Sequence, residues 1–196
     1  MTSKGSILVG TVGQGIMMSR DDGESWTRIS VRQGMHSDGI VRCLTADPRR
    51  ADVVYAGTDK GLYRSDDGGD SWTDIANGVP SDFGFALEID HNNPNTAYII
   101  PLESDEFRCT PEAKLRVYKT SNAGDSWEPM TNGLPQENAF ETILRDGMSG
   151  DSGQPMGIYF GTRNGKLFGS NDAGSSWYAI EEGLPQVVCV KTATVA

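Results

Sequence analysis

The chain has 196 residues, of which 24 are glycine and 22% are charged, and it is long enough to bury a core as one domain. Its net charge of −10 argues against nucleic acid and anionic membranes as partners, because their phosphates attract basic side chains. The first residues lack the apolar core of a signal peptide, no stretch is long enough to cross a bilayer, and three scattered cysteines do not form a disulfide framework. The sequence therefore predicts a cytoplasmic protein.

Short strand-like runs separated by turns follow one another along the chain and predict an all-β fold. The first unit has three runs, at 6–11, 15–18 and 26–29. The next three units have four runs each, at 40–44, 53–57, 62–64 and 72–75; at 83–89, 96–100, 115–119 and 127–130; and at 140–144, 157–161, 166–168 and 177–180. One further run, at 187–194, remains at the C-terminal end.

The last turn of each unit carries the pattern Ser-x-Asp-x-Gly-x-x-Trp, with Thr120 replacing serine in the third copy, and we call each copy a box. The Asp or Asn side chain can accept hydrogen bonds from nearby amides, the glycine can adopt a positive φ, and the tryptophan can pack on the neighbouring unit. A calcium site is the alternative, but the pattern lacks the closing glutamate of a calcium loop, so we interpret the box as a structural turn. The key positions are Asp21, Asp67, Asn122 and Asp172, followed by Trp26, Trp72, Trp127 and Trp177.

This pattern resembles the Asp-box, or BNR, repeat of sialidases, Vps10-type receptors, photosystem assembly factors and other β-propellers. The resemblance extends over nearly the whole chain. It implies blades of four antiparallel strands with the box between the third and fourth strands. It implies little about activity, because functions differ widely among these proteins.

The run at 187–194 can supply the innermost strand that the first unit lacks, which would close a ring and remove two free sheet edges. We therefore expect a single small β-propeller with four blades, and a two-chain ring of eight blades is the alternative. The expected blades are 6–30 plus 187–195, 39–76, 83–131 and 139–181.

One connection between a second and a third strand, at 101–114, is much longer than the others. Long insertions on a regular scaffold often carry function. In a propeller this loop lies on the same face as the connections between blades, opposite the boxes. We therefore expect the functional site on this face, with Glu103, Asp105 and Arg108 contributed by the long loop.

The connections between blades place carboxylates at one equivalent position, and clustered carboxylates persist when a cation or solvent neutralises them. We expect a calcium, magnesium or zinc ion here, with His36, Glu103 and Asp105 as catalytic groups. A solvated acidic rim is the alternative. The expected metal ligands are Asp38, Asp82, Glu137 and Asn138.

Further charged residues could bind a substrate in or near the central channel: Arg42, Arg108, Glu141, Arg163 and Lys191. For Arg42, Glu141 and Lys191 the alternative is an ion-pair network that closes a narrow pore, because buried charges normally pair.

Three functions are compatible with these residues, and all imply a small-molecule ligand or a protein partner without an organic cofactor. The first is a metal-assisted hydrolase of phosphotriesters, lactones or esters. The second is a noncatalytic binding scaffold, and the third is a glycan-binding or glycosidase-like protein with paired carboxylates. Sialidase activity is not expected. The resemblance implies three arginines that converge on the substrate carboxylate and an Arg-Ile-Pro motif before the first box, but three converging arginines are not evident and the chain before Ser19 contains no arginine.

Overall fold

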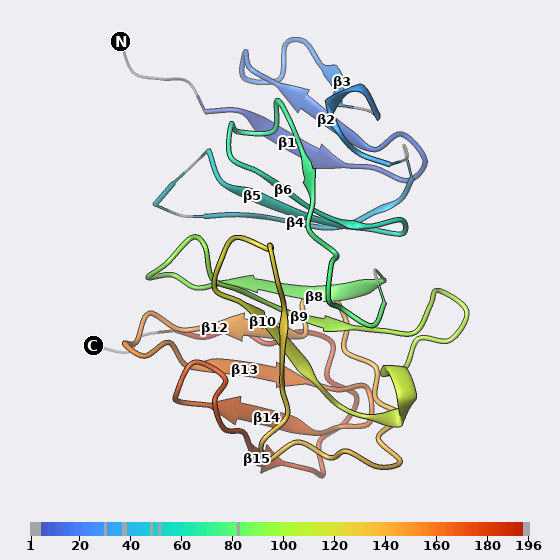
Figure 1. Ribbon diagram of the computed structural model, residues 1–196, viewed down its shortest axis with the longest axis vertical. Helices are drawn as coiled ribbons and strands as arrows, with labels where there is room; N and C mark the ends of the chain where they lie inside the picture. The colour runs from blue at the N-terminus through green and yellow to red at the C-terminus, as the bar shows by residue number, and fades with distance from the viewer. Residues whose placement is uncertain are drawn as a thin grey trace.

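The computed structural model describes residues 5–29, 31–36, 39–47, 49–50, 52–81 and 83–193. It contains four antiparallel sheets and two short 3-10 turns, η1 (Val31–Gln33) and η2 (Pro111–Ala113). Figure 1 shows the sheets stacked along the long axis, with the first sheet at one end and the fourth at the other. No helix in the described ranges is long and apolar enough to span a membrane.

Each sheet is one blade, and its strands follow chain order. Blade 1 has β1 (Ile7–Gly10), β2 (Ile16–Ser19) and β3 (Thr27–Ile29). Blade 2 has β4 (Val41–Ala46), β5 (Val54–Thr58), β6 (Leu62–Ser65) and β7 (Thr73–Asp74). Blade 3 has β8 (Gly84–Ile89), β9 (Ala97–Pro101), β10 (Val117–Thr120) and β11 (Glu128–Met130). Blade 4 has β12 (Met148–Gly150), β13 (Ile158–Gly161), β14 (Leu167–Ser170) and β15 (Tyr178–Glu181).

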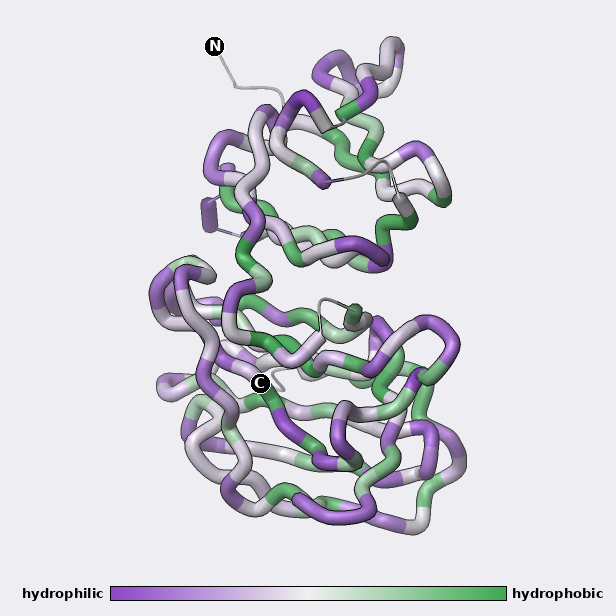
Figure 2. Tube along the Cα trace, turned by 45° about the vertical axis from the view of Figure 1, so that its right-hand side comes forward, coloured by the Kyte–Doolittle hydropathy of each residue, from purple (hydrophilic) through white to green (hydrophobic). Residues whose placement is uncertain are grey.

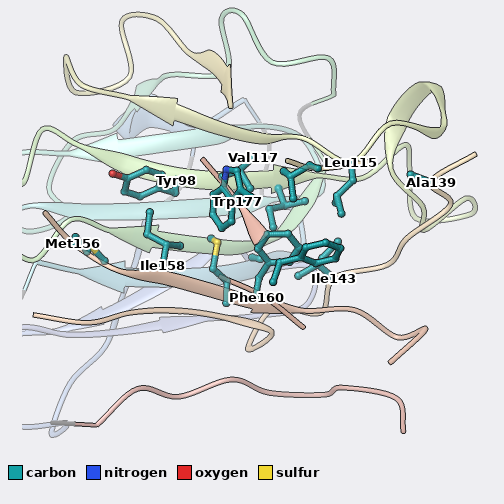
Figure 3. Close-up of a cluster of buried hydrophobic side chains, with 14 residues drawn as sticks. Tyr98, Leu115, Val117, Ala139, Ile143, Met156, Ile158, Phe160 and Trp177 are labelled. Carbon is teal, nitrogen blue, oxygen red and sulfur yellow. The ribbon is translucent and has the colours of Figure 1, made fainter. Parts of the chain in front are cut away.

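Apolar residues are buried between consecutive blades, and the core is therefore divided into three main clusters. Each cluster contains the box tryptophan of the later of its two blades: Trp72, Trp127 or Trp177. Figure 3 shows Trp177 of blade 4 among side chains of blades 3 and 4, including Tyr98 and Phe160. The tryptophans thus join successive blades, because each supplies a large apolar ring to the sheet before it.

Each box is a hydrogen-bonded turn. In the second box, the Gly69 amide donates to Ser65 Oγ at 2.8 Å and the Ser71 amide donates to Asp67 Oδ1 at 2.8 Å. Gly69 has a φ of 100°, a conformation that favours glycine. The third box makes the same bonds with Thr120 and Asn122.

These bonds make an acid-sensitive contribution to stability. Hydrogen bonds from Ser25 lower the pKa of Asp21 from 3.8 to about 2. Because this folded-state pKa is depressed, the contribution is present above the unfolded pKa and is lost as the pH falls from about 4 towards 2. We expect the melting temperature to fall less for an Asp21→Asn variant than for the wild type between about pH 4 and pH 2. An equal loss would contradict this role for Asp21, and the third box, with Asn122, is the natural precedent for the substitution.

The innermost strand of blade 4 lies at β12, so the predicted strand at 140–144 is wrong. This segment pairs mainly with the long loop, besides a main-chain bond from the Arg163 amide to the Thr142 carbonyl. The Thr110 amide donates to the Glu141 carbonyl at 3.0 Å, and the Ala139 amide donates to the Ala113 carbonyl at 2.9 Å. The partner was unexpected, because the inserted loop supplies an edge that the other blades lack.

The C-terminal segment 187–193 lies beside blade 4. The Val187 amide donates to the Thr162 carbonyl at 3.1 Å, and the Val190 amide donates to the Asp146 carbonyl at 2.8 Å. The first of these bonds repeats the one from Val41 to Thr11, which places the innermost strand of blade 2 beside blade 1. Residues 187–193 therefore occupy the position of the innermost strand of a following blade, and closure of a ring onto β1 is not confirmed.

Candidate functional site

A pocket of about 450 Å³ opens between β4, the start of β8 and the long loop. It lies on the face predicted from the position of that loop. Both signs of charge line it, so it is not the purely acidic mouth that the sequence suggested. The charged residues at its wall are Arg42, Asp59, Lys60, Glu103, Asp105 and Glu106.

Arg42 enters this pocket because it is the extra residue of a β-bulge in β4. The register between β4 and β5 shifts between Val41 and Cys43, and a bulge of this kind redirects the side chain of the inserted residue. The guanidinium lies over the ring of Phe83, 5.4 Å from its centroid, and pairs with Asp105 at 3.2 Å. Arg42 is thus held on two sides by an aromatic ring and a carboxylate.

The long loop is ordered by its own hydrogen bonds. The Glu103 amide donates to the Cys109 carbonyl at 2.8 Å, and the Phe107 amide donates to Ser104 Oγ at 3.0 Å. Asp105 accepts hydrogen bonds from Arg108 as well as from Arg42, and these two guanidinium groups lower its pKa. Asp105 therefore remains an ionised carboxylate near neutral pH.

Two exposed phenylalanines lie on the long loop and on the segment that pairs with it. Phe107 at the tip of the long loop is 66% exposed, and Phe140 in the segment paired with that loop is 62% exposed. Exposed apolar surface often marks a binding site where several such side chains adjoin, so these two rings on paired segments are candidate ligand contacts. Neither residue was predicted as a ligand contact, although a phenylalanine in a strongly polar loop was the available signal.

The part of the chain that the structure describes does not show the predicted metal ligands gathered into one site. Glu137 and Asn138 are exposed, and Asp38 and Asp82 lie outside the described ranges. His36 pairs with Asp74 at 3.3 Å instead of lining the pocket. Within the described ranges no group of three His, Cys, Asp or Glu side chains is arranged to hold a metal ion. A divalent metal that also involves Asp38 and Asp82 stays a prediction, which elemental analysis of the purified protein tests.

Two of the three predicted channel residues, Arg42 and Glu141, pair with different residues. Arg42 pairs with Asp105, and the Glu141 carboxylate, which is 2% exposed, pairs with Lys166 at 2.8 Å. Lys191 lies in a second pocket, of about 360 Å³, along the innermost strands. Burial raises the pKa of Glu88 in that pocket, and His91 and Lys191 oppose the shift. These ion pairs do not form one continuous network through Arg42, Glu141 and Lys191.

The remaining predicted arginines lie towards the exposed side of the same face. Arg108 is tied to Asp105, and its carbonyl accepts a hydrogen bond from the Thr142 hydroxyl. Arg163 is exposed, and its amide donates to the Thr142 carbonyl at 2.9 Å. Both therefore lie next to the strand-like segment 139–142, not in the pocket that Arg42 lines.

Comparisons with known proteins agree with this architecture. Residues 14–143 match the family described as Sortilin, neurotensin receptor 3 (Sortilin-Vps10). The chain is 23% identical over 163 residues to a xyloglucanase of Hypocrea jecorina (strain QM6a) and 25% identical over 162 residues to a xyloglucanase of a Paenibacillus species. These alignments include 83% and 78% of this chain, but only 18% and 14% of the two relatives.

Solved structures show the same fold. An ancestral GH74 enzyme superposes with a TM-score of 0.71 at 17% identity, over 93% of this chain and 23% of that one. The GH74 enzyme of Niastella koreensis superposes with a TM-score of 0.63 at 18% identity, over 90% of this chain and 28% of that one. The chain thus spans less than a third of each of these proteins, and at these identities the likeness concerns the fold.

Proposed function

The chain belongs to the sortilin-Vps10 family of β-propellers, and from this premise we propose that its long-loop face binds a polysaccharide in a glycosidase-like manner. The observation that carries the proposal is the pocket lined by Arg42, Lys60 and several carboxylates of the long loop, a loop that also carries exposed Phe107. The kinship with xyloglucanases directs the choice of ligand to β-glucans such as xyloglucan.

The chemistry of this face suits a sugar chain. Sugar rings present apolar C–H faces, which an exposed phenylalanine can cover, and a rim of hydroxyls, which charged groups can bind. Phe107 and Phe140 provide the apolar surfaces. Arg42 and Lys60 can donate hydrogen bonds to hydroxyls, and Glu103 can accept them. A pocket with a few fixed polar groups beside apolar surface is typical of ligand sites.

Hydrolysis of a glycosidic bond needs two carboxyl groups, one acid and one base or nucleophile. Asp105 is our candidate for the nucleophile, which must be ionised, because Arg108 and Arg42 lower its pKa and keep it charged. Glu103 lines the same pocket and is our candidate for the acid. His36 contributes to neither step in this proposal, because it pairs with Asp74 away from the pocket.

Affinity electrophoresis in gels that contain xyloglucan, mixed-linkage glucan or mannan tests the proposal. We expect retardation of the wild-type protein by xyloglucan and about a tenfold weaker affinity for a Phe107→Ala variant. Phe107→Tyr is the matched control, since it keeps an aromatic ring at the same exposed position and should retain the affinity. Retardation by none of the three glycans, or equal loss in both variants, would contradict the proposal.

Release of reducing ends from xyloglucan separates binding from catalysis. Release that disappears in Asp105→Asn and Glu103→Gln supports the assignment of the two carboxyl groups. Binding without any release would remove the catalytic part and leave a glycan-binding module.

A further inference from the structure

The box tryptophans lie at the junction between consecutive blades, and this junction occurs three times within the chain. Trp72, Trp127 and Trp177 are 4%, 5% and 5% exposed, because each is covered by the preceding blade. Trp26 occupies the same position in the first box and is 42% exposed. The outer surface of blade 1 is therefore one half of a blade–blade junction.

The other half of the junction lies three residues after each tryptophan. Ile29 and Ile75 hold this position in blades 1 and 2, and the following blade covers them to 2% and 4% exposure. At the second junction the Trp127 indole N–H also donates to the Ile75 carbonyl at 2.6 Å. Ile180 holds the same position in blade 4 and is 44% exposed.

Main-chain hydrogen bonds repeat the same pairing. The Trp72 amide donates to the Gln33 carbonyl at 2.7 Å, and the Trp177 amide donates to the Asn132 carbonyl at 2.9 Å. Gln33 and Asn132 each precede the glycine of a connection between blades. Glu182 precedes Gly183 in the same way at the end of blade 4. The two ends of the stack thus carry the donor and the acceptor sides of one junction.

The sheet edges are complementary as well. In blades 2 to 4 the second strand pairs with an innermost strand, as in β4 with β5, whereas blade 1 begins at its second strand, β1. Residues 187–193 lie in the position of an innermost strand, and the described chain places no sheet outside them. An exposed strand edge readily pairs with another chain.

We propose that blade 4 of one chain receives blade 1 of a second copy, head to tail. Trp26 of the second copy packs on Ile180, and residues 187–193 become the innermost strand beside its β1. The partner is a second copy because the chain itself carries both halves of the junction, in the form already used between its own blades. Such a contact is heterologous, and it forms a ring where the rotation closes.

Packing of the two ends within one chain would satisfy the same groups, but the described arrangement separates them. Figures 1 and 2 show blade 1 and blade 4 at opposite ends of the stack. Each blade contacts its neighbours in sequence, through β1 and β4, β4 and β8, and β8 and β12. Apolar residues are exposed at both ends of the stack, and a partner that presents the opposite end would cover them. They are Ile7, Val9 and Trp26 in blade 1, and Tyr178, Ile180 and Leu184 at the blade 4 end.

Sedimentation of the purified chain, and of two variants that each damage one half, tests the proposal. The wild type is expected to sediment with at least twice the chain mass of 21.2 kDa. Trp26→Glu and Ile180→Lys should each weaken self-association by about thirtyfold or more, as for a buried contact at the centre of an interface. Val12→Lys is the control, since Val12 is 79% exposed in a loop of blade 1.

A mixture of the two variants gives the decisive result. Trp26→Glu retains the blade 4 half and Ile180→Lys retains the blade 1 half, so the mixture should form a one-to-one complex although neither variant associates alone. A misfolded variant would not complement the other. A monomeric wild type overturns the proposal, whether the Trp26 ring is exposed or buried by closure within one chain. Failure of the mixture to associate, with both variants folded by circular dichroism, also overturns it.

Discussion

Replacing Trp177 by alanine is expected to lower the free energy of unfolding by about 3–5 kcal/mol, as for large-to-small changes at buried aromatic positions. The ring is 5% exposed and lies 5.2 Å from the ring of Phe160, centroid to centroid, inside the cluster that joins blades 3 and 4. Its loss leaves a cavity between two sheets, and the surrounding strands can close it only in part, because their packing elsewhere holds the sheets in place. Urea denaturation followed by circular dichroism measures the change.

Trp26→Ala is the matched control, because it makes the same chemical change in the same turn. The Trp26 ring is 42% exposed, so at protein concentrations low enough to avoid association we expect a loss below about 1.5 kcal/mol. Similar losses in the two variants would contradict the account of the boxes as anchors between blades.

Replacing Lys166 by methionine is expected to lower the free energy of unfolding by about 2–4 kcal/mol, because it leaves a buried carboxylate without its cation. Glu141 is 2% exposed, its Oε1 pairs with Lys166 at 2.8 Å, and its Oε2 has no hydrogen-bond partner among the described groups. Methionine keeps most of the length of the lysine side chain, so the change mainly removes charge. Thermal and urea unfolding at neutral pH measure the effect.

Two further variants separate charge from packing. In the double variant Glu141→Gln with Lys166→Met the buried charge is absent, and at least half of the lost stability should return. Lys114→Met, which breaks an exposed pair with Glu112 at 3.3 Å, should change stability by less than about 0.5 kcal/mol. Equal effects at Lys114 and Lys166 would show that burial of Glu141 is unimportant.

The sequence predicted the β-propeller fold and most of its strands because each box fixes the end of a third strand and the start of a fourth. The strands of blades 1 to 3 fall within a few residues of their predicted positions. Blade 4 departs from the prediction where the long loop supplies an extra edge to residues 139–142. Strand pairing depends on which edges meet in space, and the local pattern of 140–144 carries no information about its partner.

The candidate site was predicted less well. A pocket does lie beside the long loop, and its role as the binding face stays a prediction. The bulge that directs Arg42 towards Asp105 has no evident sequence signal. The carboxylates were grouped by assumed rotational symmetry, whereas the described residues show Asp105 neutralised by arginines and His36 paired with Asp74. Charge pairing within a site depends on side-chain direction, which the repeat pattern does not specify.

Hydrogen–deuterium exchange with and without a xyloglucan oligosaccharide tests most directly whether the long-loop face is the binding site. We predict slower exchange in peptides that include residues 101–114 and 139–144, and unchanged exchange in the four box turns. The boxes join third and fourth strands, and therefore lie at the opposite ends of the blades from the long loop. Protection confined to the boxes, or no protection at ligand concentrations that saturate binding, would contradict the assignment of this face.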